Sequence, residues 1–138
     1  MPNKQNSDIS KLMQESANDA VIYCQQEHKI TLDRSIESLQ QLDKILAKFH
    51  QQEQQKPHDA EILFTISNMF AAYIGEVFIA NVGGSWANNE TDAKAPFIYI
   101  QFADKEFPFA SVCYHKIMHD NTISVYDYVM QAMANALQ

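Results

Sequence analysis

The sequence predicts a helix-rich α+β fold with a long central helix, a small antiparallel sheet of two or three strands and two C-terminal helices. Three observations lead to this prediction. Most of the chain carries apolar residues at three- and four-residue steps, which is the pattern of amphipathic helices. One short segment, residues 97–102, is rich in β-branched and aromatic residues, as strands are. The chain has only three glycines and four prolines, too few for an all-β protein with many turns.

Residues 1–56 predict two amphipathic helices. Ser7 or Asp8 is suited to cap the first of them. Its apolar face consists of Ile9, Leu12, Met13, Ala17, Ala20, Val21 and Cys24. Asp33 is expected to be the N-cap of the second helix. The apolar face of that helix consists of Ile36, Leu39, Leu42, Ile45, Leu46 and Phe49. The polar run at residues 51–56 predicts a frayed end or a hinge.

Residues 59–82 predict the central helix. Its apolar residues cover most of the circumference, so several neighbouring elements are expected to bury it. These residues are Ile62, Leu63, Ile66, Met69, Phe70, Tyr73, Ile74, Val77 and Phe78. Gly75 inside the helix is expected to let another backbone come close. Gly83 and Gly84 are expected to end the helix, because glycine adopts the left-handed conformation at low cost.

The segment after the central helix predicts the small sheet. Residues 85–87 suit a short first strand, and residues 88–94 suit a polar loop. Residues 97–102 predict the clearest strand, and residues 103–105 resemble a turn. Residues 106–107 are then expected to pair back onto that strand, which gives two or three antiparallel strands.

Two helices are predicted to close the domain. Pro108 suits the first position of a helix, and the apolar residues after it fall at helical spacing. Asp120 and Asn121 are expected to break this helix. Ser124 with Asp127 then resembles a capping box at the start of the last helix. The apolar face of the last helix consists of Val125, Tyr128, Val129, Ala132, Met133, Ala136 and Leu137.

The chain is predicted to form a single domain, residues 1–138, in which the charge is unevenly spread. Residues 1–56 carry seven Lys/Arg and eight Asp/Glu, whereas residues 57–138 carry three Lys/Arg and nine Asp/Glu, a net charge of −6 out of the total of −7. A segment with so few cations is poorly suited to bind nucleic acid, because it can neutralise few phosphates. The same charge attracts a basic partner, although acidity also serves solubility alone.

Composition predicts a soluble, cytoplasmic protein. The two cysteines, Cys24 and Cys113, are widely separated, as is typical of reduced thiols in a cytosolic protein. The N-terminal residues are polar and do not resemble a secretory signal. The longest apolar run, residues 62–82, is interrupted by Asn68, Glu76 and Asn81, so no membrane association is predicted.

Two pairs of side chains have the four-residue spacing that would place two metal ligands on one helix face. They are Cys24 with His28, and His115 with His119. Zinc normally takes at least three protein ligands, and neither pair has an obvious third. Ordinary packing is therefore favoured for both pairs, and no metal or cofactor is predicted.

Other candidates for chemistry also have structural explanations. Cys113 has apolar neighbours, which favours a core thiol over a nucleophile. Glu76 is the only carboxylate within the apolar part of the central helix. It is either a partly buried functional acid or, as we favour, a carboxylate bonded to the backbone or to a nearby hydroxyl. Trp86 suits an interface anchor and a core residue equally well. The chain is accordingly not predicted to be an enzyme.

The second half of the chain resembles a known sequence pattern. Residues 72–77 read A-Y-I-G-E-V, residues 83–86 read G-G-S-W, and Phe107, Pro108 and Phe109 follow a strand. This pattern, which covers roughly residues 59–137, resembles small bacterial domains of uncharacterised function, some of which occur as immunity proteins of toxins. The resemblance implies a helix that ends at G-G-x-W, a hairpin and a helix led by proline.

These observations predict an immunity protein or antitoxin that binds and neutralises a cognate bacterial toxin. The toxin is expected to act in the cytoplasm and to have a basic surface, as a nuclease delivered by a secretion system would. The residues predicted to bind it are Trp86, Glu90, Asp92, Asp104, Glu106 and Asp120. Two alternatives stay open. The chain could be a regulatory module whose first two helices pair with a second copy to form a homodimer, or a small enzyme that uses Glu76 with a histidine.

Overall fold

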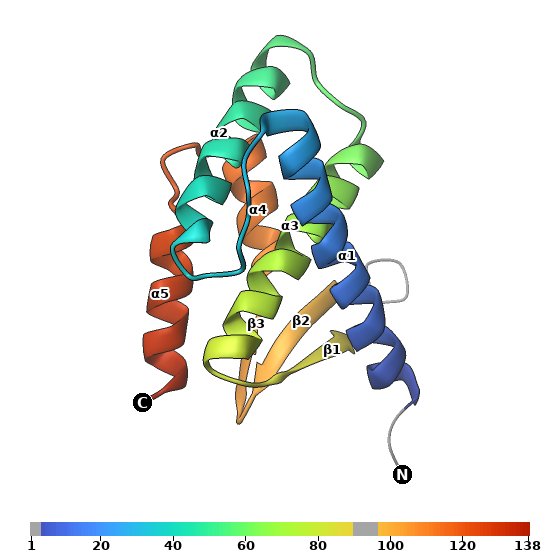
Figure 1. The fold of residues 1–138 in the computed structure, drawn as a ribbon, viewed down its shortest axis with the longest axis vertical. Helices are drawn as coiled ribbons and strands as arrows, with labels where there is room; N and C mark the ends of the chain where they lie inside the picture. Colours follow the sequence, from blue (N-terminus) through green and yellow to red (C-terminus); the bar gives the residue numbers. More distant parts are fainter. Residues whose placement is uncertain (1–3, 90–96) are drawn as a thin grey trace.

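The structure is a computed structural model that describes residues 4–89 and 97–138 (Figure 1). Its elements, in chain order, are α1 (Lys4–His28), α2 (Ser38–Gln55), α3 (Ala60–Asn81), β1 (Ser85–Asn89), β2 (Phe97–Phe102), β3 (Lys105–Phe107), α4 (Phe109–Met118) and α5 (Val125–Ala136). The strands form one antiparallel sheet in the order β1-β2-β3. The predicted α+β class, with a small sheet and two C-terminal helices, is confirmed.

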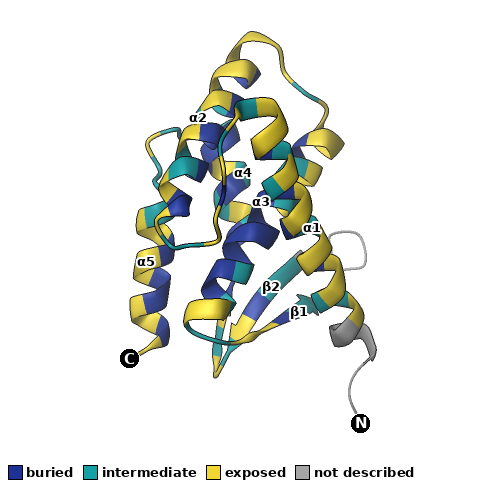
Figure 2. Ribbon diagram, in the orientation of Figure 1, coloured by how far each residue is buried: buried dark blue, intermediate teal, exposed yellow. Residues whose placement is uncertain are grey.

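Helix α3 is the centre of the fold, as its apolar circumference predicts. It packs against α1 on one side and against α4 on another, while the sheet lies beside its C-terminal half (Figure 1). The largest fully buried side chains include Tyr73, Phe70 and Phe78 of this helix. Helix α2 lies against α4 and α5, and one cluster of buried residues joins α1 through α5. The buried residues of α5 face this core in Figure 2.

The buried face of α1 is narrower than predicted. Met13, Ala17, Ala20 and Cys24 are buried, which confirms most of the stripe. Leu12, however, is 52% exposed, because α3 and β1 cover only one side of the helix. The helix also begins at Lys4, earlier than the predicted caps.

The prediction that Asp33 caps α2 is wrong. The helix begins at Ser38, because Arg34 has a φ of +67° and cannot continue a right-handed helix. The carboxylate of Asp33 instead accepts hydrogen bonds from the backbone N and the Oγ of Ser35. Tyr73 of α3 fixes this connection between α1 and α2. Its Oη accepts a hydrogen bond from Arg34 N at 2.8 Å and shares another with Ser38 Oγ at 2.5 Å.

The prediction of a frayed end at residues 51–56 is also wrong. Helix α2 continues to Gln55, and within the polar run the side chain of Glu53 is buried. Its Oε2 accepts hydrogen bonds from His58 N at 3.0 Å and from His58 Nδ1 at 2.9 Å. Burial acts to raise the pKa of Glu53, but the hydrogen bonds from His58 outweigh it and lower this pKa. The pair therefore closes the α2–α3 connection.

Predicted turns and caps around the sheet are largely confirmed. Gly83 and Gly84 end α3 with φ values of +116° and +100°. Pro108 precedes α4 as its N-cap residue and does not occupy the first helical position. Ser124 caps α5 by accepting a hydrogen bond from Asp127 N at 3.0 Å. On α5, Tyr128 and Leu137 belong to the predicted apolar face but are exposed.

Helix α3 is also long and apolar enough to cross a membrane. More than half of its most apolar 18-residue window is buried inside the fold, and the core helix of a soluble protein meets the same criteria. Length and composition therefore do not assign this helix to a membrane, and the cytoplasmic location stays a prediction.

Candidate functional site

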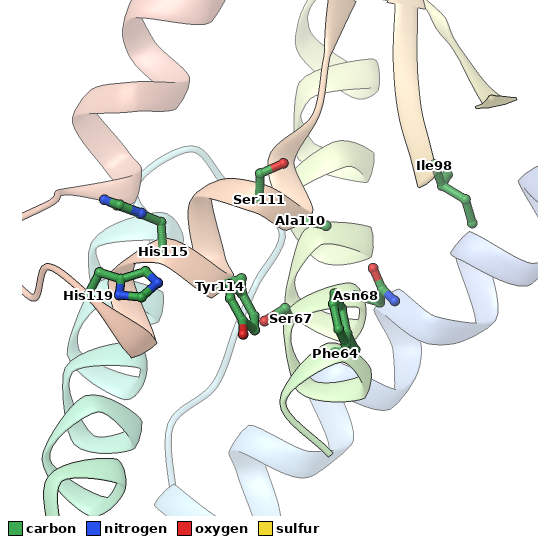
Figure 3. Close-up of a pocket in the computed structure, with 9 residues that line it drawn as sticks. All are labelled: Phe64, Ser67, Asn68, Ile98, Ala110, Ser111, Tyr114, His115 and His119. Atoms are coloured by element: carbon green, nitrogen blue, oxygen red, sulfur yellow. The ribbon is translucent and has the colours of Figure 1, made fainter. Parts of the chain in front are cut away.

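A cavity of about 480 Å³ lies between α3 and α4, next to the start of β2 (Figure 3). Pockets of this size, apolar with a few polar groups, are the usual form of a binding site. The residues that line it are Phe64, Ser67, Asn68, Ile98, Ala110, Ser111, Tyr114, His115 and His119. They come from the N-terminal half of α3, from β2, and from α4 and the residue after it.

The cavity exists because small residues face each other where the two helices meet. Ser67 of α3 and Ala110 and Ser111 of α4 line the space, and none of them is long enough to fill it. Ser67 lies one helical turn after Phe64 on α3, and Ser111 lies one turn before Tyr114 on α4. On each helix a large aromatic ring is therefore the neighbour of a small residue that leaves space beside it.

An aromatic pair flanks the cavity. The rings of Phe64 and Tyr114 stack with centroids 5.3 Å apart and planes at 17°. Phe64 is 56% exposed, and Ile62, which was predicted to be buried, is 46% exposed, so the start of α3 is only partly covered by the fold. The pair therefore presents an apolar edge to solvent beside the cavity.

A buried hydroxyl lines the same cavity. Ser67 is 1% exposed, and its Oγ has no hydrogen-bond partner. Figure 3 shows its side chain reaching from α3 toward the ring of Tyr114. Leaving such a hydroxyl unpaired costs about 1–3 kcal/mol. This cost would be relieved by any occupant that brings a polar atom to Ser67.

The predicted spacing of His115 and His119 places both imidazoles at the cavity. Their ring centroids are 5.2 Å apart, and that of His119 lies 6.4 Å from the ring of Tyr114. Among the described residues, no group of three His, Cys, Asp or Glu side chains is placed to hold a metal ion. Both imidazoles line the cavity and can offer hydrogen bonds to an occupant.

The predicted acidic binding residues do not line the cavity, and those described lie in two separate places. Asp104 and Glu106 are exposed at the β2–β3 hairpin. Asp120 lies beyond the far end of α4, a helix about 15 Å long, and the α4–α5 connection that holds it runs beside α2 in Figure 1. Hydrogen bonds from Thr122 lower the pKa of Asp120. Glu90 and Asp92 lie outside the described residues.

Trp86 is a core residue, so its prediction as an anchor for a partner is wrong. The indole is 3% exposed and fills the space over Gly75, where an added Cβ would lie 2.0 Å from Trp86 Cη2. Its Nε1 donates a hydrogen bond to Glu76 Oε2 at 3.0 Å. The close neighbour of Gly75 is thus a side chain and not a second backbone. Glu76 thus has a structural partner, but this partner is an indole N–H and not the backbone group or hydroxyl that we favoured.

The second half of the chain carries few cations, and the described ones are held within the fold. Two of its three cations are described, and both are engaged with backbone carbonyls. Lys105 Nζ donates to Asn135 O, and Lys116 is buried, with Nζ donating to Asn121 O at 2.9 Å. Neither lysine forms an ion pair with Asp104 or Glu106 in the described structure. These two carboxylates therefore keep their charge available to solvent or to a partner.

Lys116 belongs to an arrangement that the sequence did not reveal. Its Nζ lies 3.8 Å from Asp43 Oδ1, across the α2–α4 contact. Asp43 also accepts hydrogen bonds from the backbone N of Val125 at 2.6 Å and of Tyr126 at 3.0 Å, and from Ser124 Oγ at 3.2 Å. A carboxylate at the N-terminus of α5 is favoured by the helix dipole. Asp43 and Lys116 thus hold α4 and α5 against α2, on the side of α4 away from the cavity.

Neither cysteine is a reactive thiol. Both are buried, and burial raises the pKa of Cys24 to about 11 and that of Cys113 to about 12. A thiol with so high a pKa forms little thiolate near neutral pH. His28, the other member of the predicted pair, contacts the rings of Tyr23 and Phe49. These findings favour the core positions that the sequence suggested.

The cavity itself was not predicted. The sequence identified His115 and His119 as a pair but gave no reason to place Phe64, Ser67 or Tyr114 beside them. The available signal was a phenylalanine outside the apolar stripe of α3, with a serine one turn later. No protein-family model, curated protein or solved structure matches this chain.

Proposed function

We propose that this chain is an immunity protein or antitoxin, which binds a basic surface of a cognate toxin and thereby neutralises it. The observation that carries the proposal is the exposed pair of carboxylates at the β2–β3 hairpin, neither of which forms an ion pair in the described structure. Asp104 and Glu106 are exposed, while Lys105 between them is engaged with a backbone carbonyl on α5. An acidic surface of this kind steers association with a basic partner and fixes its orientation.

The side-chain chemistry of the described residues favours binding over catalysis. The two thiols are buried and hold their protons. Glu76, the candidate acid, accepts a hydrogen bond from an indole that is itself part of the core. A carboxylate committed to a structural partner is poorly placed to exchange protons with a substrate. The alternative of an enzyme that uses Glu76 is therefore the weaker proposal.

The partner would be a protein that acts in the cytoplasm, and a nuclease is the most suitable class. A nuclease needs a basic cleft to hold phosphates, and carboxylates at an exposed hairpin are suited to border such a cleft. The two carboxylates would contribute mainly to the association rate, because exposed charges are screened and add little to the affinity of a formed complex.

The proposal is tested by co-expressing the chain with the protein encoded by the neighbouring gene. We expect that protein to be toxic alone, to be tolerated with the chain, and to elute with it on gel filtration. The double variant Asp104→Asn, Glu106→Gln should slow association by about tenfold at low salt and flatten its dependence on ionic strength.

A matched control is available on α1, where Glu15 and Asp19 are also exposed. The double variant Glu15→Gln, Asp19→Asn removes the same charge from another surface and should leave the association rate nearly unchanged. An equal loss in both double variants would show that net charge alone acts, and would contradict a role for the hairpin. No toxicity and no complex would refute the proposed function.

A second candidate, a regulatory module that forms a homodimer, is favoured by one observation. Leu12 and Ile22 are 52% and 53% exposed on α1, with the exposed Glu15 and Asp19 between them. If two copies pair through these two apolar residues, the double variant Leu12→Glu, Ile22→Glu should halve the mass measured by light scattering. A monomeric mass for the unmodified protein at high concentration would remove this candidate. Deletion of residues 1–56 is unsuitable as a test, because α1 covers α3 in the core.

A further inference from the structure

We propose that the cavity between α3 and α4 is a binding site for a small, uncharged, planar molecule of one or two fused rings that carries a single hydroxyl or carbonyl group. The site is separate from the acidic hairpin that carries the proposed function. It is defined by the nine lining residues, by their small members and by the unpaired hydroxyl of Ser67 (Figure 3).

The size of the cavity sets the size of the ligand. Its volume of about 480 Å³ is roughly three times that of a ~150 Å³ apolar cavity that admits benzene. Two fused rings with a substituent therefore fit with some space to spare. The parallel rings of Phe64 and Tyr114 and the side chain of Ile98 supply apolar contacts for a flat molecule.

The unpaired hydroxyl of Ser67 determines which polar group the ligand should carry. Ser67 is 1% exposed, so water reaches it only through the cavity. Its Oγ can donate one hydrogen bond and accept others, so it can pair with a hydroxyl or a carbonyl oxygen of the ligand. An apolar molecule would leave this group unpaired, whereas a ligand with one polar atom at the right place would not. The cavity should therefore distinguish two ligands that differ only in a hydroxyl.

The lining also argues against a charged ligand. No lysine, arginine, aspartate or glutamate is among the described residues that line the cavity. An ionised group placed beside Ser67 would lose its hydration without gaining an opposite charge. His115 and His119 line the cavity from the C-terminal end of α4, and both are exposed, so they can hydrogen-bond the outer part of a bound molecule.

A small molecule suits this space better than an inserted segment of a protein. The apolar edge is limited to Phe64 and Tyr114, and the exposed polar residues Asn68, Ser111 and His115 interrupt it. A groove that receives an amphipathic helix would instead continue along several turns.

The proposal is tested with two probes, 2-naphthol and naphthalene, which differ by one hydroxyl. Each is titrated into ¹⁵N-labelled full-length protein, and backbone amide shifts are followed by NMR. We expect 2-naphthol to bind saturably with a Kd below about 1 mM, with the largest shifts around Ser67 and Tyr114. Naphthalene should bind about tenfold more weakly, which corresponds to about 1.4 kcal/mol.

Variants test the role of the Ser67 hydroxyl and the role of the cavity volume separately. Ser67→Ala should bind both probes alike, because it removes the group that distinguishes them. Ala110→Leu and Ser111→Phe should each abolish binding of both probes by filling the cavity. Ala134→Leu, on the exposed face of α5, adds the same leucine outside the cavity and should leave binding unchanged. Thermal melting checks that each variant is folded, and two filling variants are used so that one misfolded protein leaves the test intact.

Three results would overturn the proposal. The first is the absence of saturable 2-naphthol binding to the unmodified protein. The second is binding that survives in a folded filling variant, which would place the probe elsewhere. The third is loss of a protein complex in the filling variants when neither probe binds the unmodified protein, because the recess would then be a docking site for a partner. An unchanged preference for 2-naphthol in Ser67→Ala would refute the role of the hydroxyl.

Discussion

The two halves of α3 solve the same packing problem in opposite ways. In the C-terminal half, Gly75 leaves a gap on the helix surface, and the indole of Trp86 fills it. In the N-terminal half, Ser67 leaves a gap that faces Ala110 and Ser111 of α4, and no side chain fills it. The filled gap has its polar neighbour satisfied, since Glu76 accepts from Trp86 Nε1 at 3.0 Å. The open gap keeps an unpaired hydroxyl.

The difference shows that small residues in a contact between helices can have two roles, close packing or the creation of empty volume. A glycine opposite a large rigid ring is required for close packing, so any larger residue produces a clash. Small residues that face other small residues create volume, so a larger residue there costs little or even improves packing. The first arrangement stabilises the fold, whereas the second forgoes contacts and is suited to hold something else. Substitutions at the two ends should therefore differ in size and in sign.

The largest effect on stability is expected for Gly75→Ala in the C-terminal half of α3, where the gap is filled. The new Cβ would lie 2.0 Å from Trp86 Cη2 and 2.9 Å from Ile100 Cδ1, so the indole must move out of the core. We expect a loss of about 3 kcal/mol or more in the free energy of unfolding. Urea unfolding followed by the fluorescence of Trp86, the only tryptophan, measures it directly.

A double-mutant cycle with Trp86→Phe provides the control. Phenylalanine lacks the outer ring atoms that Gly75→Ala would meet, so the cost of the alanine should be much smaller in that background. Circular dichroism replaces fluorescence as the probe in these variants. Equal costs in the two backgrounds would contradict the view that the indole is the reason for the glycine.

The second largest effect on stability is expected for Asp43→Asn. Asp43 lies on α2, on the opposite side of α4 from the open gap. Asp43 and Lys116 hold α4 from the side of α2, opposite the cavity. Asparagine can accept from fewer of the three donors at the start of α5 and leaves the buried Lys116 without a counter-charge. We expect a loss of about 2–3 kcal/mol in the free energy of unfolding.

Asp127→Asn is the comparison variant for Asp43→Asn. It lies in the first turn of α5, is exposed, and should cost less than about 1 kcal/mol. Urea unfolding of both variants at neutral pH is the measurement. If Asp43→Asn costs no more than Asp127→Asn, α4 is not held in the way that the contacts indicate.

A pH-dependent effect on stability is expected at the α2–α3 connection, which leads into the N-terminal half of α3. His58 lowers the pKa of Glu53 in the folded protein, so the ionised carboxylate contributes stability above its unfolded pKa of about 4.5. This contribution is lost as the pH falls through the lower, folded pKa. Glu53→Gln should cost about 1–3 kcal/mol at pH 7. Its difference from the unmodified protein should shrink below pH 4.5, and a difference that does not change with pH would contradict the assignment.

A smaller effect is expected for Glu76→Gln in the filled half. The amide oxygen of glutamine can still accept from Trp86 Nε1, so the loss should be about 1 kcal/mol or less. The emission of Trp86 should shift slightly, because the charge beside the indole disappears. Loss of a measurable catalytic activity with unchanged stability would revive the proposal of an enzyme that uses Glu76.

How far the sequence predicted this molecule depends on whether a feature is set within one segment. The central helix, strand 97–102 and the Ser124 cap follow from residues close in the chain, and they were predicted. The filled gap was half predicted, because Gly75 was identified as a contact but its partner was not. The open gap was missed, since Ser67 and Ala110 come together only when α3 and α4 are placed side by side. The start of α2 was wrong for the same reason, because the distant Tyr73 fixes that connection.

The smallest change, Ser67→Ala, tests the comparison most directly, because its sign should be reversed. Removing a hydroxyl that has no partner relieves an unmet polar group, so the free energy of unfolding should stay the same or rise by up to about 1 kcal/mol. Ser38→Ala is the matched control, because Ser38 is also a buried serine but its Oγ bonds to Tyr73 Oη and Ser35 O. That variant should lose about 1–3 kcal/mol. Similar losses at both serines, measured by urea unfolding, would mean that the hydroxyl of Ser67 is satisfied in solution and that the two halves of α3 do not differ as their contacts indicate.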